Sequence, residues 1–291
     1  MEILPQLIVS GLAAGSLYAL MALGMILIFK TTDVVNFAHG DMAMISSFVA
    51  LTLMRGYHQP YWLAVLAAIA MGFVLGALAD LILRPARNAP ILTLLIATLG
   101  ISLMLSALGG HFFGYQTVSF PYALVGKPFV IAGVILTRHN ALALGVAAAL
   151  GLGLFALLKY TSVGTAMRAM AQNRLAAQLM GVNVRRVSTL SWGLGAALGA
   201  VAGVLIAPVV FLDLNTMITV LIKAFAAAVL GGFTSLLGAV VGGLLLGVLE
   251  NLVGGYLSTQ LQTTFVFLLI IVMLAIRPRG LLGAPVAGRR A

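Results

Sequence analysis

Cysteine and charged residues are the two things this chain has least of. Its 291 residues include no cysteine, and only 8% of them are charged. The absence of cysteine excludes a disulfide framework and any metal site built on thiolate ligands. A soluble domain carries about 25% charged residues, so this chain has too few to cover a water-facing surface. We therefore exclude an ordinary soluble protein.

The signature motifs of several enzyme classes are also absent. The sequence contains no phosphate-binding loop GxxxxGK[ST], no zinc motif HExxH and no nucleophile motif GxSxG. We therefore expect neither ATP hydrolysis nor hydrolytic chemistry from this chain, and no cofactor or metal ion bound to it. If the chain serves a powered process, the energy comes from another subunit.

Long apolar runs dominate what is present. Hydrophobic residues make up 62% of the chain, and its mean hydropathy is +1.16. A run of about 20 apolar residues is long enough to cross a bilayer as a helix. Nine such runs, each bounded by charge, Pro, Gly or Asn, lie at residues 4–29, 34–54, 61–83, 91–113, 140–158, 188–212, 217–230, 236–256 and 262–276. They predict an all-α polytopic membrane protein, a single membrane domain over residues 1–291 with eight or nine transmembrane helices.

The seventh run decides between eight and nine crossings. It is short, and it ends at the glycine pair Gly231–Gly232. Glycine pairs interrupt helices, so we predict a broken or re-entrant segment here, with Gly231 and Gly232 as its hinge or break.

Basic residues predict the orientation. The net charge is +10, but the basic residues are divided among short connections and do not form one stripe, so we expect no nucleic-acid partner. Nine crossings with the N-terminus outside put twelve Lys and Arg residues in inner connections and three in outer ones. An excess of Lys and Arg marks the cytoplasmic side. The connection at 113–139 is then extracytoplasmic, and the connection at 159–187 is cytoplasmic.

The 159–187 connection is the longest polar interruption of the chain. It carries five basic residues and no acidic one, and residues 163–180 are rich in helix-forming Ala, Met, Leu, Gln and Arg. Thr161 and Ser162 are suitable N-caps, and Gly181 suits a left-handed C-cap. We predict one cytoplasmic coupling helix over 163–180 that touches a cytosolic partner. The alternative is a surface-lying helix held by anionic lipid.

The faces of this helix differ in chemistry. Arg168 and Gln172 share one face by their i, i+4 spacing, whereas Met167, Met170 and Ala171 lie nearer the opposite side. Methionine surfaces adapt to many partners, so we expect the Met and Ala side to suit docking.

The run 33–41 places polar groups at the start of a membrane span. Polar groups in hydrocarbon are costly unless they are paired, hydrated or turned to the bundle interior. The polar side chains of this run are Asp33, Asn36, His39 and Asp41. We interpret the run as an irregular helix start that lines a cavity, shaped by Phe37, Ala38 and Gly40. The alternative is a solvated interfacial turn. A metal site is not expected, because no second metal-binding residue lies at ligand spacing.

Two pairs of opposite charges are predicted. Asp80 precedes Arg84 by four positions, the favourable order for a helical ion pair. Lys223 and Glu250 both lie in or near spans and could pair across helices, which would fix packing more than it would carry protons.

Five segments together resemble a known family. They are residues 11–28 (GLAAGSLYALMALGMILI), 34–44 (VVNFAHGDMAM), 164–186, 223–251 and 277–283 (RPRGLLG). In sequence and order they resemble the LivH-type permeases of branched-chain amino acid ABC importers, over nearly the whole chain.

The resemblance implies a function, a location and partners. A member translocates Leu, Ile and Val across the bacterial inner membrane, driven by ATP hydrolysis in separate subunits. It pairs with a second related permease, so a heterodimer is expected, and it binds two cytosolic ATPase subunits and a periplasmic substrate-binding protein. The substrate pathway would be lined by Asn36, Phe37, Ala38, His39, Gly40 and Asp41. The ATPase contacts and caps would be Arg168, Ala169, Asn173, Gly181, Val182 and Asn183.

Two other functions are weighed against this one. A stand-alone secondary transporter or channel for amino acids or small amides would work without partners. A membrane scaffold would bind a cytosolic partner and move no solute. The missing nucleotide motif and the basic cytoplasmic loop favour the importer subunit over both.

Overall fold

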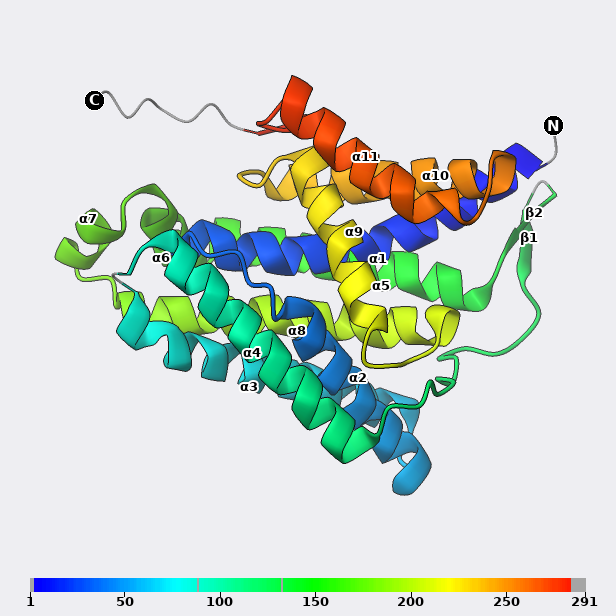
Figure 1. Ribbon diagram of the computed structural model, residues 1–291, viewed down its shortest axis with the longest axis horizontal. Coiled ribbons are helices and arrows are strands. Elements are labelled where there is room, and N and C mark those ends of the chain that lie inside the picture. The colour runs from blue at the N-terminus through cyan, green and yellow to red at the C-terminus, as the bar shows by residue number, and fades with distance from the viewer. Residues whose placement is uncertain (1–2, 88, 132, 284–291) are drawn as a thin grey trace.

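The computed structural model describes residues 3–87, 89–131 and 133–283. This part of the chain contains nine long helices: α1 Ile3–Thr32, α2 His39–Gly56, α3 Tyr61–Leu83, α4 Ile91–Phe113, α5 Arg138–Tyr160, α8 Val184–Val210, α9 Thr216–Gly231, α10 Leu236–Tyr256 and α11 Leu261–Ile276 (Figure 1). Between them lie the 3-10 turn η1 Arg84–Ala86, the short helices α6 Ser162–Gln172 and α7 Arg174–Leu179, and an antiparallel hairpin of β1 Phe129–Ile131 with β2 Val134–Leu136.

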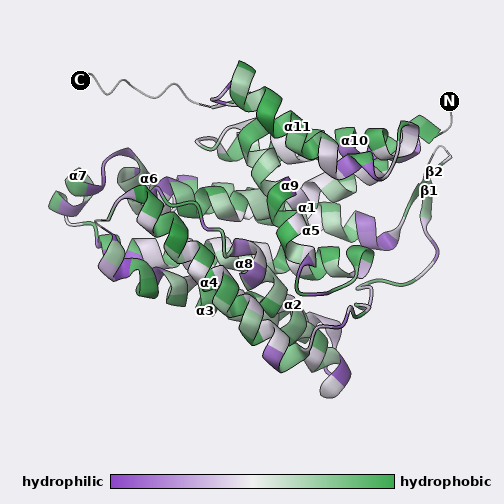
Figure 2. Ribbon diagram, in the orientation of Figure 1, coloured by the Kyte–Doolittle hydropathy of each residue, from purple (hydrophilic) through white to green (hydrophobic). Residues whose placement is uncertain are grey.

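The predicted fold class is confirmed. Six helices of the described residues are long and apolar enough to cross a membrane, and α9 and α11 are shorter apolar helices. Figure 2 shows hydrophobic residues along the lengths of the long helices and hydrophilic ones gathered around α7 and the connections. Residues 3–283 therefore form an all-α polytopic membrane protein whose helix ends follow the apolar runs within a few residues.

Helix α1 is the centre of the bundle. It packs most extensively against α10 and α8 and also contacts α5 and α9. Small residues permit the close approach: a Cβ added to Gly15 would lie 2.5 Å from the Gly243 carbonyl oxygen of α10. The α3–α8 contact is built alike, since a Cβ on Gly76 would lie 2.3 Å from the Trp192 oxygen. Membrane helices associate mainly through such packing, as expected from the glycine content.

The connections gather at two opposite ends of the bundle (Figure 1). At one end, Gln6 of α1 bonds to Ile135 of the hairpin, Arg55 of α2 bonds to Ser119, and Val118 pairs with Leu212. At the other end, the α9–α10 connection and the ends of α1, α5 and α6 surround one cavity. This grouping is the one that the nine-crossing topology predicts, with the basic loop 159–187 opposite the hairpin.

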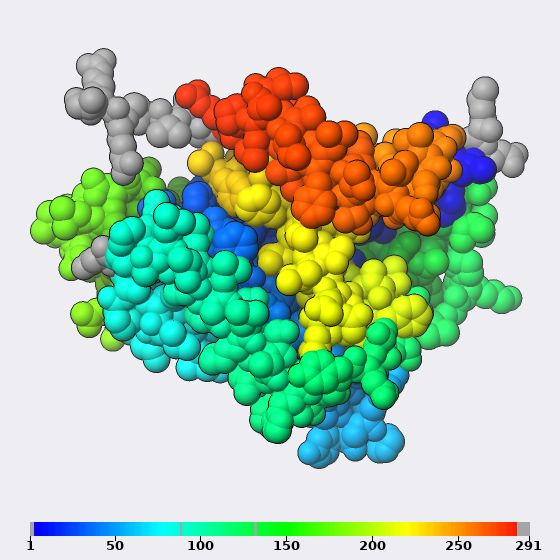
Figure 3. Space-filling view, in the orientation of Figure 1, coloured from blue at the N-terminus to red at the C-terminus, as the bar shows by residue number. Residues whose placement is uncertain are grey.

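Helix α9 runs between these two ends, so it is not re-entrant. It begins beside Leu212 and ends at Gly231, where the break was expected. Its carbonyl end is closed by the 277–283 segment: the N–H of Leu281 donates to the Leu230 oxygen at 2.8 Å, and the N–H of Leu282 donates to the Gly231 oxygen at 3.0 Å. In Figure 3 the surface of α9 lies between those of α4 and α11. The segment of the chain that does re-enter the bundle lies between α1 and α2.

Candidate functional site

Residues 33–38 turn back into the bundle before α2 begins. Helix α1 continues to Thr32, and the span expected at 34–54 starts as helix only at His39. The Asn36 side-chain oxygen accepts from the Ala38 N–H at 3.0 Å, which stabilises the turn. The Phe37 N–H donates to Thr98 Oγ of α4 at 3.4 Å. Because Thr98 is seven residues into α4, the turn lies about 10 Å from the cytoplasmic end of that helix.

The first turn of α2 is therefore inside the membrane region. Asp41 lies in this turn, is 5% exposed, and accepts a hydrogen bond from the Ser102 hydroxyl of α4. The positive end of a helix dipole stabilises a carboxylate at this position. The irregular helix start that the sequence predicted is thus present, anchored to α4 at Thr98 and Ser102.

His39 fills a socket between three helices. It is fully buried, and a Cβ added to Gly24 of α1 or to Gly199 of α8 would lie 3.1 Å or 2.9 Å from its ring. Neither ring nitrogen makes a hydrogen bond of good geometry to the described residues. In this conformation its imidazole is a packing element.

The six predicted pathway residues lie together, but they are turned inward. Phe37 is half-buried, whereas Asn36, Ala38, His39, Gly40 and Asp41 are buried. Their role in a pathway stays a prediction, and it would require this segment to move or a partner to open it.

The cytoplasmic loop holds two helices where one was predicted. Asn173 ends α6 and begins α7: its backbone is extended, its N–H donates to the Ala169 oxygen, and its side chain accepts from Ala176 N–H at 3.0 Å. Because an Asn in extended conformation caps a new helix rather than continuing an old one, the expected helix over 163–180 is wrong at this point. Thr161, and not Ser162, is the N-cap of α6.

The other predicted caps are present. Gly181 has φ +86°, and the N–H groups of Gly181 and Val182 donate to the Gln178 and Ala177 oxygens at 3.0 Å each. This pair of bonds is a Schellman motif, which closes α7. Asn183 then caps α8 by accepting from Arg186 N–H at 3.1 Å.

The exposed apolar surface of the loop is not the one expected. Met167 and Met170 of α6 are buried against the bundle, so the expectation that they dock a partner is wrong for this conformation. Instead Leu175, Leu179 and Met180 are 68%, 79% and 85% exposed at the tip of α7. Leu175 and Leu179 share one face by i, i+4 spacing. Their pattern is too short for sequence reasoning to separate from the long apolar runs nearby.

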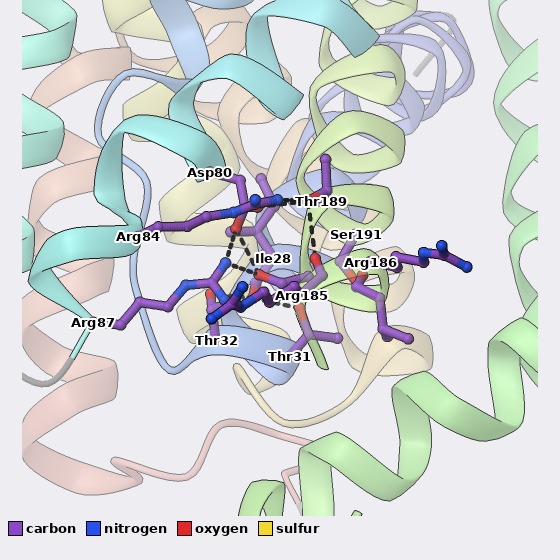
Figure 4. A network of polar contacts seen from close by, with 12 residues as sticks. Ile28, Thr31, Thr32, Asp80, Arg84, Arg87, Arg185, Arg186, Thr189 and Ser191 are labelled. Carbon is purple, nitrogen blue, oxygen red and sulfur yellow. Dashed lines mark hydrogen bonds and ion pairs between the residues drawn. The ribbon is translucent and has the colours of Figure 1, made fainter. Parts of the chain in front are cut away.

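Asp80 joins α3 to α8 just after the loop (Figure 4). It is 2% exposed and accepts from Ser188 at 2.6 Å, from Thr189 at 2.7 Å, from Arg84 at 3.4 Å and from Arg87. The Arg84 pair was predicted from helical spacing. The other three partners could not be, because tertiary packing brings them together. Figure 4 also shows Arg186 pointing away from this network.

Arg174 of α7 borders the same region. It lines a small cavity together with Asp80, Arg87 and Trp192. Burial lowers the pKa of Arg174, the charge of Arg87 adds to this effect, and Asp80 and Asp33 oppose it. The loop is thereby tied electrostatically to the end of α3.

The second predicted ion pair is also present. Lys223 of α9 donates to Glu250 of α10 at 2.5 Å and to the Tyr18 hydroxyl of α1 at 3.2 Å. These contacts join three helices inside the bundle.

Comparison with known proteins places the chain in a family. Residues 7–276 match the family model described as "Branched-chain amino acid transport system / permease component". The high-affinity branched-chain amino acid transport system permease protein LivH of Salmonella typhimurium is 35% identical, with 96% of each chain covered. The corresponding permease protein BraD of Pseudomonas aeruginosa is also 35% identical, again over 96% of each chain.

A solved structure supports the architecture alone. A chain of PsaBC from Streptococcus pneumoniae in complex with Fab aligns with a TM-score of 0.52 and 15% identity, over 94% of this chain and 92% of that one. The family match spans all nine long helices or most of each. The protein therefore belongs to the family of permease components of branched-chain amino acid transport systems, and it is a multi-pass protein of the inner membrane.

Proposed function

We propose that this chain is the permease subunit of a binding-protein-dependent ABC importer that carries leucine, isoleucine and valine into the cell. The observation that carries the proposal is the similarity to LivH and BraD over 96% of the chain. The absence of a phosphate-binding loop is consistent with ATP hydrolysis in separate subunits, and we propose that the chain itself is not catalytic and binds no cofactor.

We propose that α6 and α7 couple the chain to a cytosolic ATPase. The exposed Leu175, Leu179 and Met180 lie on the cytoplasmic side, where apolar side chains are unfavourable unless a partner covers them. The Asp80 network holds α8 directly after the loop to α3. A push on α7 would therefore reach two membrane helices. Arg168, Ala169 and Asn173 would contribute contacts beside this apolar tip.

We propose that residues 36–41 border the substrate path in another conformation. The segment is held by weak contacts, with distances of 3.3 Å from His39 N to Asn36 O and 3.4 Å from Phe37 N to Thr98. Transporters often place their sites at such interrupted helices, whose N-terminal N–H groups attract anionic substrate groups. Movement of this segment would open its backbone groups to an amino acid substrate.

The remaining partners follow from the same assignment. We propose a second homologous permease in a heterodimer, two ATPase subunits in the cytosol and a periplasmic substrate-binding protein. None of the described surface replaces the energy source that an ATPase supplies.

The test is uptake of labelled leucine into liposomes. The chain alone is compared with the chain plus candidate permease, ATPase and binding-protein partners, with and without ATP. ATP-dependent uptake by the full set alone supports the importer subunit. Uptake by the chain alone would overturn the proposal in favour of a secondary transporter or channel. Isoleucine, valine and small amides in the same assay decide the substrate class.

The path proposal has its own experiment in the assembled importer. Asn36→Leu removes the side-chain oxygen that accepts from Ala38, whereas Asn36→Asp keeps an acceptor there. We expect the leucine variant to lower substrate-stimulated ATPase activity about tenfold or more, and the aspartate variant to retain more of it. Equal and unchanged kinetics in both variants would contradict the proposal.

A further inference from the structure

A cavity of about 440 Å³ lies at the cytoplasmic ends of the membrane helices. Its walls come from the end of α1, the end of α5, the inner side of α6 and the α9–α10 connection, and Leu282 of the 277–283 segment closes one side. It is separate from the 33–41 segment and from the exposed tip of α7. Nothing in the proposed import cycle accounts for it.

Three cations line this cavity and no acid does. They are Lys30 of α1, Lys159 of α5 and Arg168 of α6. The chain has only six acidic residues. Those that form ion pairs among the described residues, Asp80 and Glu250, do so with Arg84, Arg87 and Lys223. The positive charge of the cavity is therefore not neutralised by a salt bridge within the described part of the chain.

The rest of the lining is apolar and continues onto the membrane-facing surface. Leu27 and Leu158 form the floor, while Phe155 and Leu237 are 46% and 64% exposed at its rim. Lys159 lies over the rings of Phe155 and Tyr160, 5.6 Å and 5.2 Å from their centroids. Aromatic rings with basic residues at the end of a span are typical of the bilayer–water interface. A ligand here meets cations at one end and hydrocarbon at the other.

The start of α10 adds a favourable dipole. Ser235 lines the cavity and is the N-cap of α10, a helix of 21 residues. The N-terminal end of a helix attracts anions. Taken alone such an end specifies nothing, but here it faces the same cavity as the three cations.

We infer that this cavity binds the phosphate headgroup of an anionic phospholipid from the cytoplasmic leaflet. Lys30 and Lys159 would contact the phosphate, and the acyl chains would lie over Phe155 and Leu237. Basic cavities between helices on the cytoplasmic side suit such headgroups. The apolar rim favours a lipid over a free anion, since free phosphate gains nothing from it. The inference rests on the orientation of the chain in the inner membrane, and not on the identity of the transported amino acid.

Native mass spectrometry of the purified chain in neutral detergent tests this inference. Phosphatidylglycerol and phosphatidylcholine are titrated separately onto wild type, onto Lys30→Gln/Lys159→Gln, and onto the matched control Arg185→Gln/Arg186→Gln. The control removes two exposed basic residues of the same cytoplasmic face, outside the cavity. We expect wild type to retain one phosphatidylglycerol per chain. Each lysine removed should weaken this binding about fivefold, and the control should match wild type.

Further arms make each outcome decisive. Lys30→Arg/Lys159→Arg should restore retention if charge is what binds, and thermal unfolding of all variants verifies folding. Equal loss in the control would assign the effect to the general surface charge and overturn the site. Displacement of the lipid by millimolar inorganic phosphate would assign the cavity to a free anion. Displacement by added ATPase subunits would assign it to an acidic group of that partner. Either displacement would overturn the lipid proposal.

Discussion

Asp80 shows how a single buried carboxylate can hold a membrane bundle together. It is one of the few acids of the chain, it lies at the end of α3, and its four partners come from α3, η1 and α8. Every lone-pair direction that faces the protein is used. Burial of a charge is tolerated here because the charge is both paired and hydrogen-bonded.

Replacement of this carboxylate should be costly. In Asp80→Asn, the Arg87 guanidinium, whose side chain is 15% exposed, loses its counter-charge. Breaking a buried pair in this way costs about 3–5 kcal/mol, and the partial exposure of Arg84 places the expected loss at the lower end. The measurement is thermal unfolding of the purified variant in detergent. Asp33→Asn, at an exposed position where Asn tolerates the observed φ of +56°, should change stability by less than about 0.5 kcal/mol. Similar melting curves for the two variants would contradict the role of Asp80.

Sequence reasoning reached only part of this residue scale. The pair of Asp80 with Arg84 follows from spacing along one helix, and the pair of Lys223 with Glu250 follows from their rarity in apolar surroundings. The socket around His39 could not be foreseen, because Gly24 and Gly199 come from distant helices. Contacts across the bundle need the tertiary structure.

At the scale of elements, the helices follow from apolar runs and their contacts follow from glycine. The run 236–256 became α10 with no change of boundary, because hydrocarbon requires every backbone group in it to be bonded within the helix. The cytoplasmic loop is different. Water can satisfy its backbone groups, so a single capping residue, Asn173, decides that two helices form. The capping preference of Asn was visible in the sequence, but the good helix formers around it outweighed it.

The α1–α10 contact predicts a sharp position dependence. In Gly15→Ala the new methyl group would lie 2.5 Å from the Gly243 oxygen, and the obstacle is backbone that cannot turn aside. Overpacking of this kind costs about 1–3 kcal/mol. The matched control is Gly145→Ala on α5, where no atom lies within 4 Å of the added group. We expect a lower unfolding temperature for the first variant and an unchanged or higher one for the second. The reverse order would contradict the packing described.

The tip of α7 predicts a coupling defect without a folding defect. Leu175→Ser/Leu179→Ser removes apolar surface that the bundle does not use, because both side chains are more than two-thirds exposed. We expect ATP-dependent uptake by the assembled importer to fall at least about tenfold, as for the loss of central contacts of an interface. Insertion and thermal stability of the chain should be unchanged. Arg185→Gln/Arg186→Gln serves as the control, and normal uptake by the leucine variant would exclude α7 from the ATPase contact.

For the whole molecule, the natural absence of cysteine is an experimental advantage. A cysteine introduced at any position is the only thiol of the chain, so a membrane-impermeant thiol reagent can read the topology. Val125 and Met180 are 83% and 85% exposed, and they lie at opposite ends of the bundle. We expect Val125→Cys to react in spheroplasts and Met180→Cys to react only after the membrane is opened. Reaction of both from outside, or the opposite order, would contradict the nine-crossing topology with its outer N-terminus.

The cap on α9 also sets an order of events during synthesis. Residues 281 and 282 supply the N–H groups that close the carbonyl end of α9, and the ribosome makes them after all nine long helices. Until then, two backbone carbonyls at the cytoplasmic end of α9 lack their partners. Folding of this permease is therefore completed from its tail, and α9 reaches its final state only when translation has almost ended.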